Sequence, residues 1–301
     1  MPITAAEKHQ KILDWFVRWG EARNCIRALI LYSSRSNPHA RVDAFSDYDI
    51  LVIVRDIQPF FTNKSYLEDF GRVLTVYKNP IGEHDGFPSF GDITQYEDGT
   101  KIDYSIFPVE WLQWAAQAPA LPVDLDNGYT VLLDKDHLTG GLKQPTYTAY
   151  IPKPPSQAEF TALVEEFYAE APYVAKNLWR DELIFWKYNL DHVMKFELLR
   201  KMIDWRYEID HNWSAKTGAY GKGLKKRSSP QTWAALECTY TGAGWEENWS
   251  ALFQTLDLFH TLAREVADHL GYPFPPDLHE RVVAYLRKVK SLDRNADVVA
   301  F

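Results

Sequence analysis

The chain has 301 residues, 46% of them hydrophobic and 15% aromatic, which corresponds to roughly two domains and excludes a disordered chain. The formal net charge of −8 argues against binding nucleic acid through an overall positive field, and it suits a small cationic substrate better. The longest apolar runs are shorter than the 18 or so residues that a membrane span needs, so we expect no contact with a membrane.

The amino terminus, MPITAAEKHQKILDW, lacks the apolar core of a signal peptide and is typical of an amphipathic helix. The chain contains two cysteines, Cys25 and Cys238. We interpret them as buried thiols in a reducing compartment rather than as a disulfide. The sequence therefore predicts a cytoplasmic protein, which we expect to be a monomer.

In the first half of the chain, large apolar residues at helical spacing predict a helix over residues 5–23. Three short runs rich in β-branched and aromatic residues predict strands, at residues 28–32, 49–54 and 101–107. The middle run is apolar at consecutive positions, as in a central strand that is covered on both faces. An Asp-Gly turn within residues 95–100 predicts a hairpin leading into the third strand.

Prolines cluster between residues 145 and 155 and predict a linker. Beyond it, capping signals and apolar stripes predict a series of helices. One begins at the Ser156–Glu159 capping box, one covers residues 181–205, one begins at Ser229, one ends at Gly271 and the last covers residues 278–290. We therefore predict an α+β protein. A small mixed-sheet domain, residues 1–150, is followed by an all-helical bundle domain, residues 151–301.

Three aspartates form the most informative pattern in the sequence. Asp47 and Asp49 lie at the start of a predicted strand, where a spacing of two places both side chains on one face, about 7 Å apart. Two such carboxylates repel each other unless a cation neutralises them. Asp103 lies within a second apolar strand and adds a third oxygen ligand if the two strands are neighbours. Ligands that are all oxygen favour Mg²⁺ or Mn²⁺.

Ser33 and Ser34 follow the first predicted strand, at a corner where backbone amides and a hydroxyl can approach phosphate oxygens. Together with the three carboxylates, this layout predicts in-line attack on a phosphoryl group with two metal ions about 3.5 to 4 Å apart. The alternative is that the Asp-Tyr-Asp sequence only caps a turn before the strand.

The small-residue corner, the Asp-Tyr-Asp pair and the third aspartate resemble the polymerase-beta-like nucleotidyltransferase superfamily. Over about residues 10–290, five segments resemble the streptomycin-modifying aminoglycoside 6-adenylyltransferases: LYSSRSNPHARVDAFSDYDILVIVRDI, DGTKIDYSIFP, AKNLWRDELIFWKYNLD, GAYGKGLKK and ENWSALFQTLDLF. The resemblance implies a nucleotidyltransferase domain followed by a helical substrate-binding domain. It also implies AMP transfer from ATP to a hydroxyl of a cationic aminoglycoside, the 6-hydroxyl in streptomycin, with two Mg²⁺ ions and release of pyrophosphate.

The resemblance also assigns roles to residues of the first half. Asp47 and Asp49 would bind both magnesium ions, and Asp103 would complete the catalytic-metal site. Ser34 would contact the triphosphate, with Ser33 and Arg35 beside it in the nucleotide site. The family's corner reads Gly-Ser, whereas this chain has Ser33 in the place of the glycine. The Cβ of serine at such a turn predicts weaker nucleotide binding.

In the second half, Asp181 is the candidate general base for the attacking hydroxyl, and Asp181 and Glu182 are candidates for binding the cationic sugar. Alternatively, both acids merely favour a helix amino terminus. Lys216 and Lys222 lie in a loop, KTGAYGKGLKKR, that can clasp the β- and γ-phosphates or serve only as an exposed hinge.

An acidic region could also contact guanidinium or amine groups, although we interpret most of it as solvated surface; it comprises Glu83, Asp85, Asp92, Glu97 and Asp98. Two other functions remain open for the chain as a whole. One is a catalytically weak homologue that binds nucleotide or aminoglycoside. The other is a nucleotidyltransferase with a different acceptor.

Overall fold

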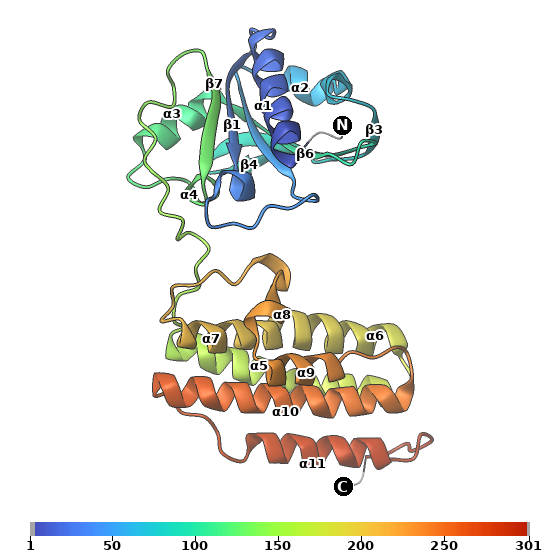
Figure 1. Ribbon diagram of the computed structural model, residues 1–301. Helices are drawn as coiled ribbons and strands as arrows, with labels where there is room; N and C mark the ends of the chain where they lie inside the picture. Colours follow the sequence, from blue (N-terminus) through green and yellow to red (C-terminus); the bar gives the residue numbers. More distant parts are fainter. Residues whose placement is uncertain (1–3, 300–301) are drawn as a thin grey trace. The chain divides into compact units, whose positions relative to one another are not determined.

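The computed structural model describes residues 4–299, which divide between Tyr150 and Ile151 into two compact units. We call residues 4–150 the sheet unit and residues 151–299 the helical unit (Figure 1). Across residues 4–299, the helices are all too short or too polar to cross a membrane.

Within residues 4–150, seven strands form a mixed sheet in the order β3-β5-β6-β2-β1-β7, with β4 paired to β5. The strands are β1 (Ile26–Tyr32), β2 (Tyr48–Val54), β3 (Val73–Lys78), β4 (Gly82–His84), β5 (Phe87–Tyr96), β6 (Lys101–Pro108) and β7 (Tyr129–Asp134). Only β2 and β6 run parallel among these pairs. The mixed sheet, its three predicted strands and the hairpin before β6 are confirmed, whereas β3, β4 and β7 were not predicted because they expose much of their length.

Helices cover both faces of this sheet, as predicted for the middle strand β2. They are α1 (Ala5–Glu21), α2 (Gln58–Thr62), α3 (Val109–Gln117) and α4 (Val123–Asp126), with short 3-10 turns η1 (Ser33–Ser36) and η2 (Ser65–Asp69). Alternate residues of β2 pack on opposite faces, Ile50 and Val52 toward α1, and Leu51 and Ile53 toward α3. We call these the α1 face and the α3 face.

The helical unit consists of stacked helices around one apolar core (Figure 1). They are α5 (Gln157–Trp179), α6 (Leu183–Lys187), the π-helical segment η3 (Tyr188–Leu199), α7 (Arg200–Asp210), η4 (Ala219–Gly221), α8 (Leu224–Arg227), α9 (Pro230–Cys238), α10 (Trp245–Leu270) and α11 (Leu278–Ser291). The predicted capping box of Ser156 and Glu159 is present, Ser229 caps α9, and Gly271 ends α10 in the left-handed conformation.

Two expectations about local structure are wrong, and the expected solvated surface of the acidic region holds for all of its residues except Asp92. The helix predicted from Asp181 begins at Leu183, because Asp181 itself adopts a left-handed φ of 60°. Cys25 and Cys238 are free thiols, but both are exposed because Cys25 lies in the loop before β1 and Cys238 at the end of α9. Asp92 is fully buried rather than solvated, since β5 turns it toward the α1 face, where Lys64 Nζ donates to it at 2.7 Å.

Candidate active site

Strand pairing brings the three aspartates of the sheet unit together. Asp49 of β2 lies directly opposite Asp103 of β6 in the parallel register, and Asp47 immediately precedes β2. The Lys101 ammonium donates a hydrogen bond of 2.6 Å to Asp47 Oδ2 and one of 2.9 Å to Asp103 Oδ2. The three carboxylates therefore gather at one end of the β2–β6 pair, around a single lysine.

This cluster carries more negative charge than Lys101 neutralises. Burial, together with the neighbouring charges of Asp103 and Asp47, raises the pKa of Asp49 to about 6, although Lys101 and a hydrogen bond from Ser33 oppose the rise. Burial likewise raises the pKa of Asp103, and the hydrogen bond from Lys101 opposes that rise. The site thus favours any additional cation that can approach the carboxylates.

The chemistry of the donors, though not their present spacing, suits a divalent cation. Asp103 Oδ1 is buried and has no hydrogen-bond partner, so one strong acceptor remains available. Carboxylate oxygens are the ligands that Mg²⁺ prefers. As they stand, no three His, Cys, Asp or Glu side chains of residues 4–299 are gathered closely enough to hold a metal. Because the Lys101 ammonium already bonds Asp47 and Asp103, a metal ion at this site would compete with it.

Ser33 occupies a backbone conformation that favours glycine. Its φ is 65°, in the left-handed region, and its N–H donates to Gly128 O at 3.0 Å. The backbone of Gly128 approaches this corner so closely that only glycine fits there. Gly128 has φ 118°, and a Cβ at this position would lie 2.6 Å from Ser36 O. The corner therefore has the backbone of the Gly-Ser pattern, with a serine side chain that hydrogen-bonds Asp49 in the glycine position.

Ser34 and Arg35 follow in the turn η1. The Arg35 guanidinium donates to Asp47 O at 2.9 Å and to Ser46 O at 2.7 Å, and it stacks 3.9 Å from the centre of the Tyr48 ring. Arg35 thereby holds the segment that carries Asp47. A direct contact of Ser34 or Arg35 with a nucleotide stays a prediction.

Lys101 is the functional residue that the sequence reasoning missed. It lies two positions before Asp103 on the same strand, and residues at that spacing share a face. A sequence pattern that includes basic as well as acidic residues on this face identifies Lys101.

In the helical unit, Asp181 lies between α5 and α6, and Glu182 is the N-cap residue of α6. Both are exposed. The Asp181 backbone is held on both sides, since its N–H donates to Leu178 O and its carbonyl accepts from Leu183 N, each at 3.2 Å. Within the part of the chain that the structure describes, the Asp181 carboxylate has no partner, so it is available to accept a proton.

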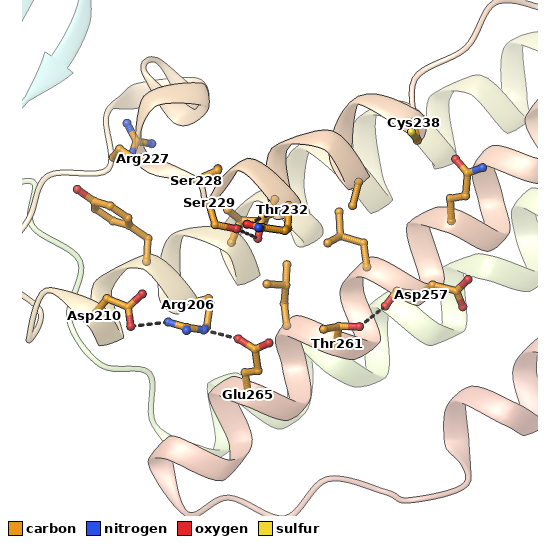
Figure 2. Close-up of a pocket in the computed structure, with 17 residues that line it drawn as sticks. Arg206, Asp210, Arg227, Ser228, Ser229, Thr232, Cys238, Asp257, Thr261 and Glu265 are labelled. Atoms are coloured by element: carbon orange, nitrogen blue, oxygen red, sulfur yellow. Dashed lines mark hydrogen bonds and ion pairs between the residues drawn. The ribbon is translucent and has the colours of Figure 1, made fainter.

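Two cavities of the helical unit, among the described residues, are not lined by these acids. One of about 660 Å³ lies among α7, α9 and α10, where Figure 2 shows Arg206 between Asp210 and Glu265. Another, of about 500 Å³, is lined by Lys225 and Lys226 of the basic loop but not by Lys216 or Lys222, whose phosphate contacts remain predictions.

The sequence matches known proteins over almost its whole length. The family model described as streptomycin adenylyltransferase matches residues 6–289. An aminoglycoside 6-adenylyltransferase of Bacillus subtilis (strain 168) is 31% identical over 281 residues, which cover 92% of this chain and 95% of the relative. The proteins of the same name from Campylobacter jejuni and Staphylococcus aureus are 28% and 26% identical, over 88% of this chain and 90% and 93% of theirs.

A solved structure described as an aminoglycoside 6-adenyltransferase from Bacillus subtilis is also similar. It is 27% identical, and the match covers 94% of this chain and 98% of that chain with a TM-score of 0.46.

Proposed function

Because the chain belongs to the streptomycin adenylyltransferase family, and is thus an adenylyltransferase, we propose that it transfers AMP from ATP to a hydroxyl of an aminoglycoside. The 6-hydroxyl of streptomycin is the proposed acceptor, after the names of the family and of the relatives. The carboxylates of Asp47, Asp49 and Asp103 around one ammonium are the observation that carries the proposal, because such a cluster suits the metal-bound triphosphate of ATP.

Two Mg²⁺ ions, when bound, supply positive charge to the α-phosphoryl oxygens and the departing pyrophosphate. Asp47 and Asp49 would hold both ions, and Asp103, with its free Oδ1, would complete one of the two sites. The Ser33 hydroxyl orients Asp49 through its hydrogen bond, while Ser34 and Arg35 would contact the triphosphate. Arg35 also fixes the backbone on which Asp47 is carried.

The transfer step needs a base and cationic support for the leaving group. The acceptor oxygen bonds to the α-phosphorus, the bond from that phosphorus to the bridging oxygen breaks, and pyrophosphate leaves with the bond's electron pair. Asp181, exposed and without a partner, would accept the hydroxyl proton. Glu182 would bind a cationic group of the sugar, and Lys216 and Lys222 would bind the phosphates.

Pyrophosphate release from ATP and Mg²⁺ with a panel of aminoglycosides tests this proposal. We expect release with streptomycin and none without an acceptor. Asp49→Asn and Asp47→Ala should reduce release below detection, whereas Asp14→Asn, at an exposed position of α1, should leave it unchanged. Near-normal turnover by either active-site variant would refute the assignment.

The strained corner at Ser33 supports one alternative, a weakly catalytic protein that binds nucleotide or aminoglycoside. Calorimetry separates the two functions. Heat of streptomycin binding without magnesium-dependent pyrophosphate release favours the binding protein. If pyrophosphate is released with an acceptor other than an aminoglycoside, the proposed reaction stands and only the proposed substrate is wrong.

A further inference from the structure

A small cavity of about 190 Å³ opens on the α3 face of the sheet unit. Its polar lining comes from the ends of several elements and comprises Tyr32, His84, Ser89, Ser105 and Asp124, with Trp111 as an aromatic wall. We call it the α3-face cavity. Its volume is too small for a whole aminoglycoside but sufficient for one ammonium or guanidinium group and a few attached atoms.

This cavity lies next to the catalytic carboxylates. Asp49 and Asp103 are paired in the β2–β6 register, and the next pair on the same face, Leu51 and Ser105, lines the cavity about 7 Å further along. The Tyr32 hydroxyl hydrogen-bonds Ser105 Oγ at 3.1 Å. Burial raises the pKa of Tyr32, and the charges of Asp49, Asp124 and Asp103 raise it further.

Two carboxylates flank His84 at the cavity. His84 Nε2 lies 3.5 Å from Asp85 Oδ2 and 3.6 Å from Asp124 Oδ2. Trp111 Nε1 donates to Asp85 Oδ2 at 3.1 Å and Tyr150 donates to Asp124 Oδ1 at 2.9 Å, which fixes both acids. Within residues 4–299, neither acid forms an ion pair with a lysine or arginine. The cavity therefore retains negative charge beside aromatic surfaces, an environment that attracts organic cations.

A buried hydroxyl points independently to a ligand. Ser89 is only 8% exposed and lines the cavity, because the odd-numbered residues of β5, such as Phe87, face α3. Its side chain has no hydrogen bond in the described chain. The Ser89 oxygen is not among the fully buried unpartnered atoms of the described chain, so it opens to the cavity, where it can accept a hydrogen bond from a group that enters.

We propose that the α3-face cavity is the acceptor subsite that binds one ammonium or guanidinium group of the aminoglycoside. This inference rests on the proposed function. Asp85 and Asp124 supply the charge, Ser89 accepts a hydrogen bond, and Trp111 covers one side of the group. Because the subsite lies one residue pair from Asp49 and Asp103, it orients the acceptor beside the carboxylates that handle the α-phosphate.

Kinetics of Asp85→Asn and Asp124→Asn test the subsite. Each variant should raise KM for streptomycin about tenfold or more, while kcat and KM for ATP stay within about threefold of the wild type. Glu83→Gln is the matched control, since it removes one charge two positions before Asp85, at an exposed residue of β4 that does not line the cavity, whereas Asp85 bonds Trp111 of the cavity wall; it should change nothing. An unchanged KM in both aspartate variants, folded as judged by circular dichroism, overturns the subsite.

A binding measurement without turnover separates this proposal from the proposed function. The indole resonance of Trp111 in a ¹⁵N spectrum, assigned with Trp111→Phe, should shift saturably with methylguanidinium in the wild type but not in Asp124→Asn. If no aminoglycoside is adenylylated but this shift occurs, the subsite stands and the acceptor assignment fails. If streptomycin is adenylylated but Trp111 does not respond, the subsite is wrong and the function stands.

Discussion

Each unit of the molecule contains a buried aspartate whose pKa is raised to about 6, but their surroundings differ. In the helical unit, burial raises the pKa of Asp204, and the guanidinium groups of Arg227 and Arg200 oppose this rise. In the sheet unit, burial and two further carboxylates raise the pKa of Asp49, and Lys101 is the opposing cation. The helical unit thus supplies its own counter-charges, whereas the sheet unit lacks enough of them. A cluster in which carboxylates outnumber the protein cations favours the approach of an additional cation.

The two units also differ in how they hold the predicted site residues. Asp47 and Lys101 are 54 positions apart and meet because strand pairing sets their register. Asp181, Glu182 and Lys222 lie in connections between helices and are exposed. Residues on paired strands have positions set by the backbone, so they are the stronger assignments.

Among the results that would contradict this comparison, the largest is a loss of kcat in the variant Asp181→Asn. If the exposed acid is the general base, Asp181→Asn lowers kcat by about 10² to 10⁴-fold and leaves KM for ATP nearly unchanged. Steady-state kinetics with streptomycin check this. Glu182→Gln is the control and should affect mainly KM for the acceptor. If kcat of Asp181→Asn stays within threefold of the wild-type value, Asp181 is not the general base and is only a loop residue.

Removing one cation from each unit sharpens the contrast in counter-charge. Lys101→Met and Arg227→Met should each destabilise the metal-free protein by about 1–3 kcal/mol, because the first removes the partner of Asp47 and Asp103 and the second removes one of the two guanidinium partners of Asp204. Thermal unfolding with and without Mg²⁺ distinguishes them. We expect Mg²⁺ to restore stability to Lys101→Met alone. Equal rescue of both variants, or of neither, contradicts the assignment of the cation site to the sheet unit.

The pH dependence of stability provides a smaller test. The folded-state pKa of Asp49, about 6, exceeds the ordinary value of about 3.9, so the folded state binds this proton more tightly. Relative to Asp49→Asn, the wild type should be favoured below about pH 4 and lose up to about 3 kcal/mol as the pH rises from about 4 to about 6. Unfolding in metal-free buffer from pH 4 to 7.5 measures it. A constant difference between the two proteins across this range would show that Asp49 titrates normally.

The smallest effect concerns the corner itself. Ser33→Gly removes a left-handed serine and should stabilise the protein by about 1 kcal/mol, with tighter ATP binding. Ser34→Gly is the control for the unfolding measurement alone, because Ser34 has no positive φ and gains nothing from glycine. Denaturant unfolding of both variants measures their stability, and ATP titration of Ser33→Gly measures its nucleotide affinity. A loss of stability in Ser33→Gly would mean that the hydroxyl bond to Asp49 outweighs the backbone strain.

Local patterns determined much of this protein in advance. The capping box at Ser156, the cap at Ser229 and the glycine stop at Gly271 each depend on residues a few positions apart, so the sequence alone was sufficient to place them. The same holds for the β-branched runs of β1, β2 and β6 and for the shared face of Asp47 and Asp49. These features follow from backbone periods of 2 and 3.6 residues.

Only the tertiary structure decided which of these features meet. The parallel β2–β6 pairing set Asp49 against Asp103 and brought Lys101 to Asp47, and the pairing of β5 with β6 turned Asp92 into the core beside Lys64. The packing of further elements gathered Ser89 and Asp124 around one cavity. Contacts between distant segments depend on strand order and register, which arise from the packing of the whole sheet rather than from any short run of residues.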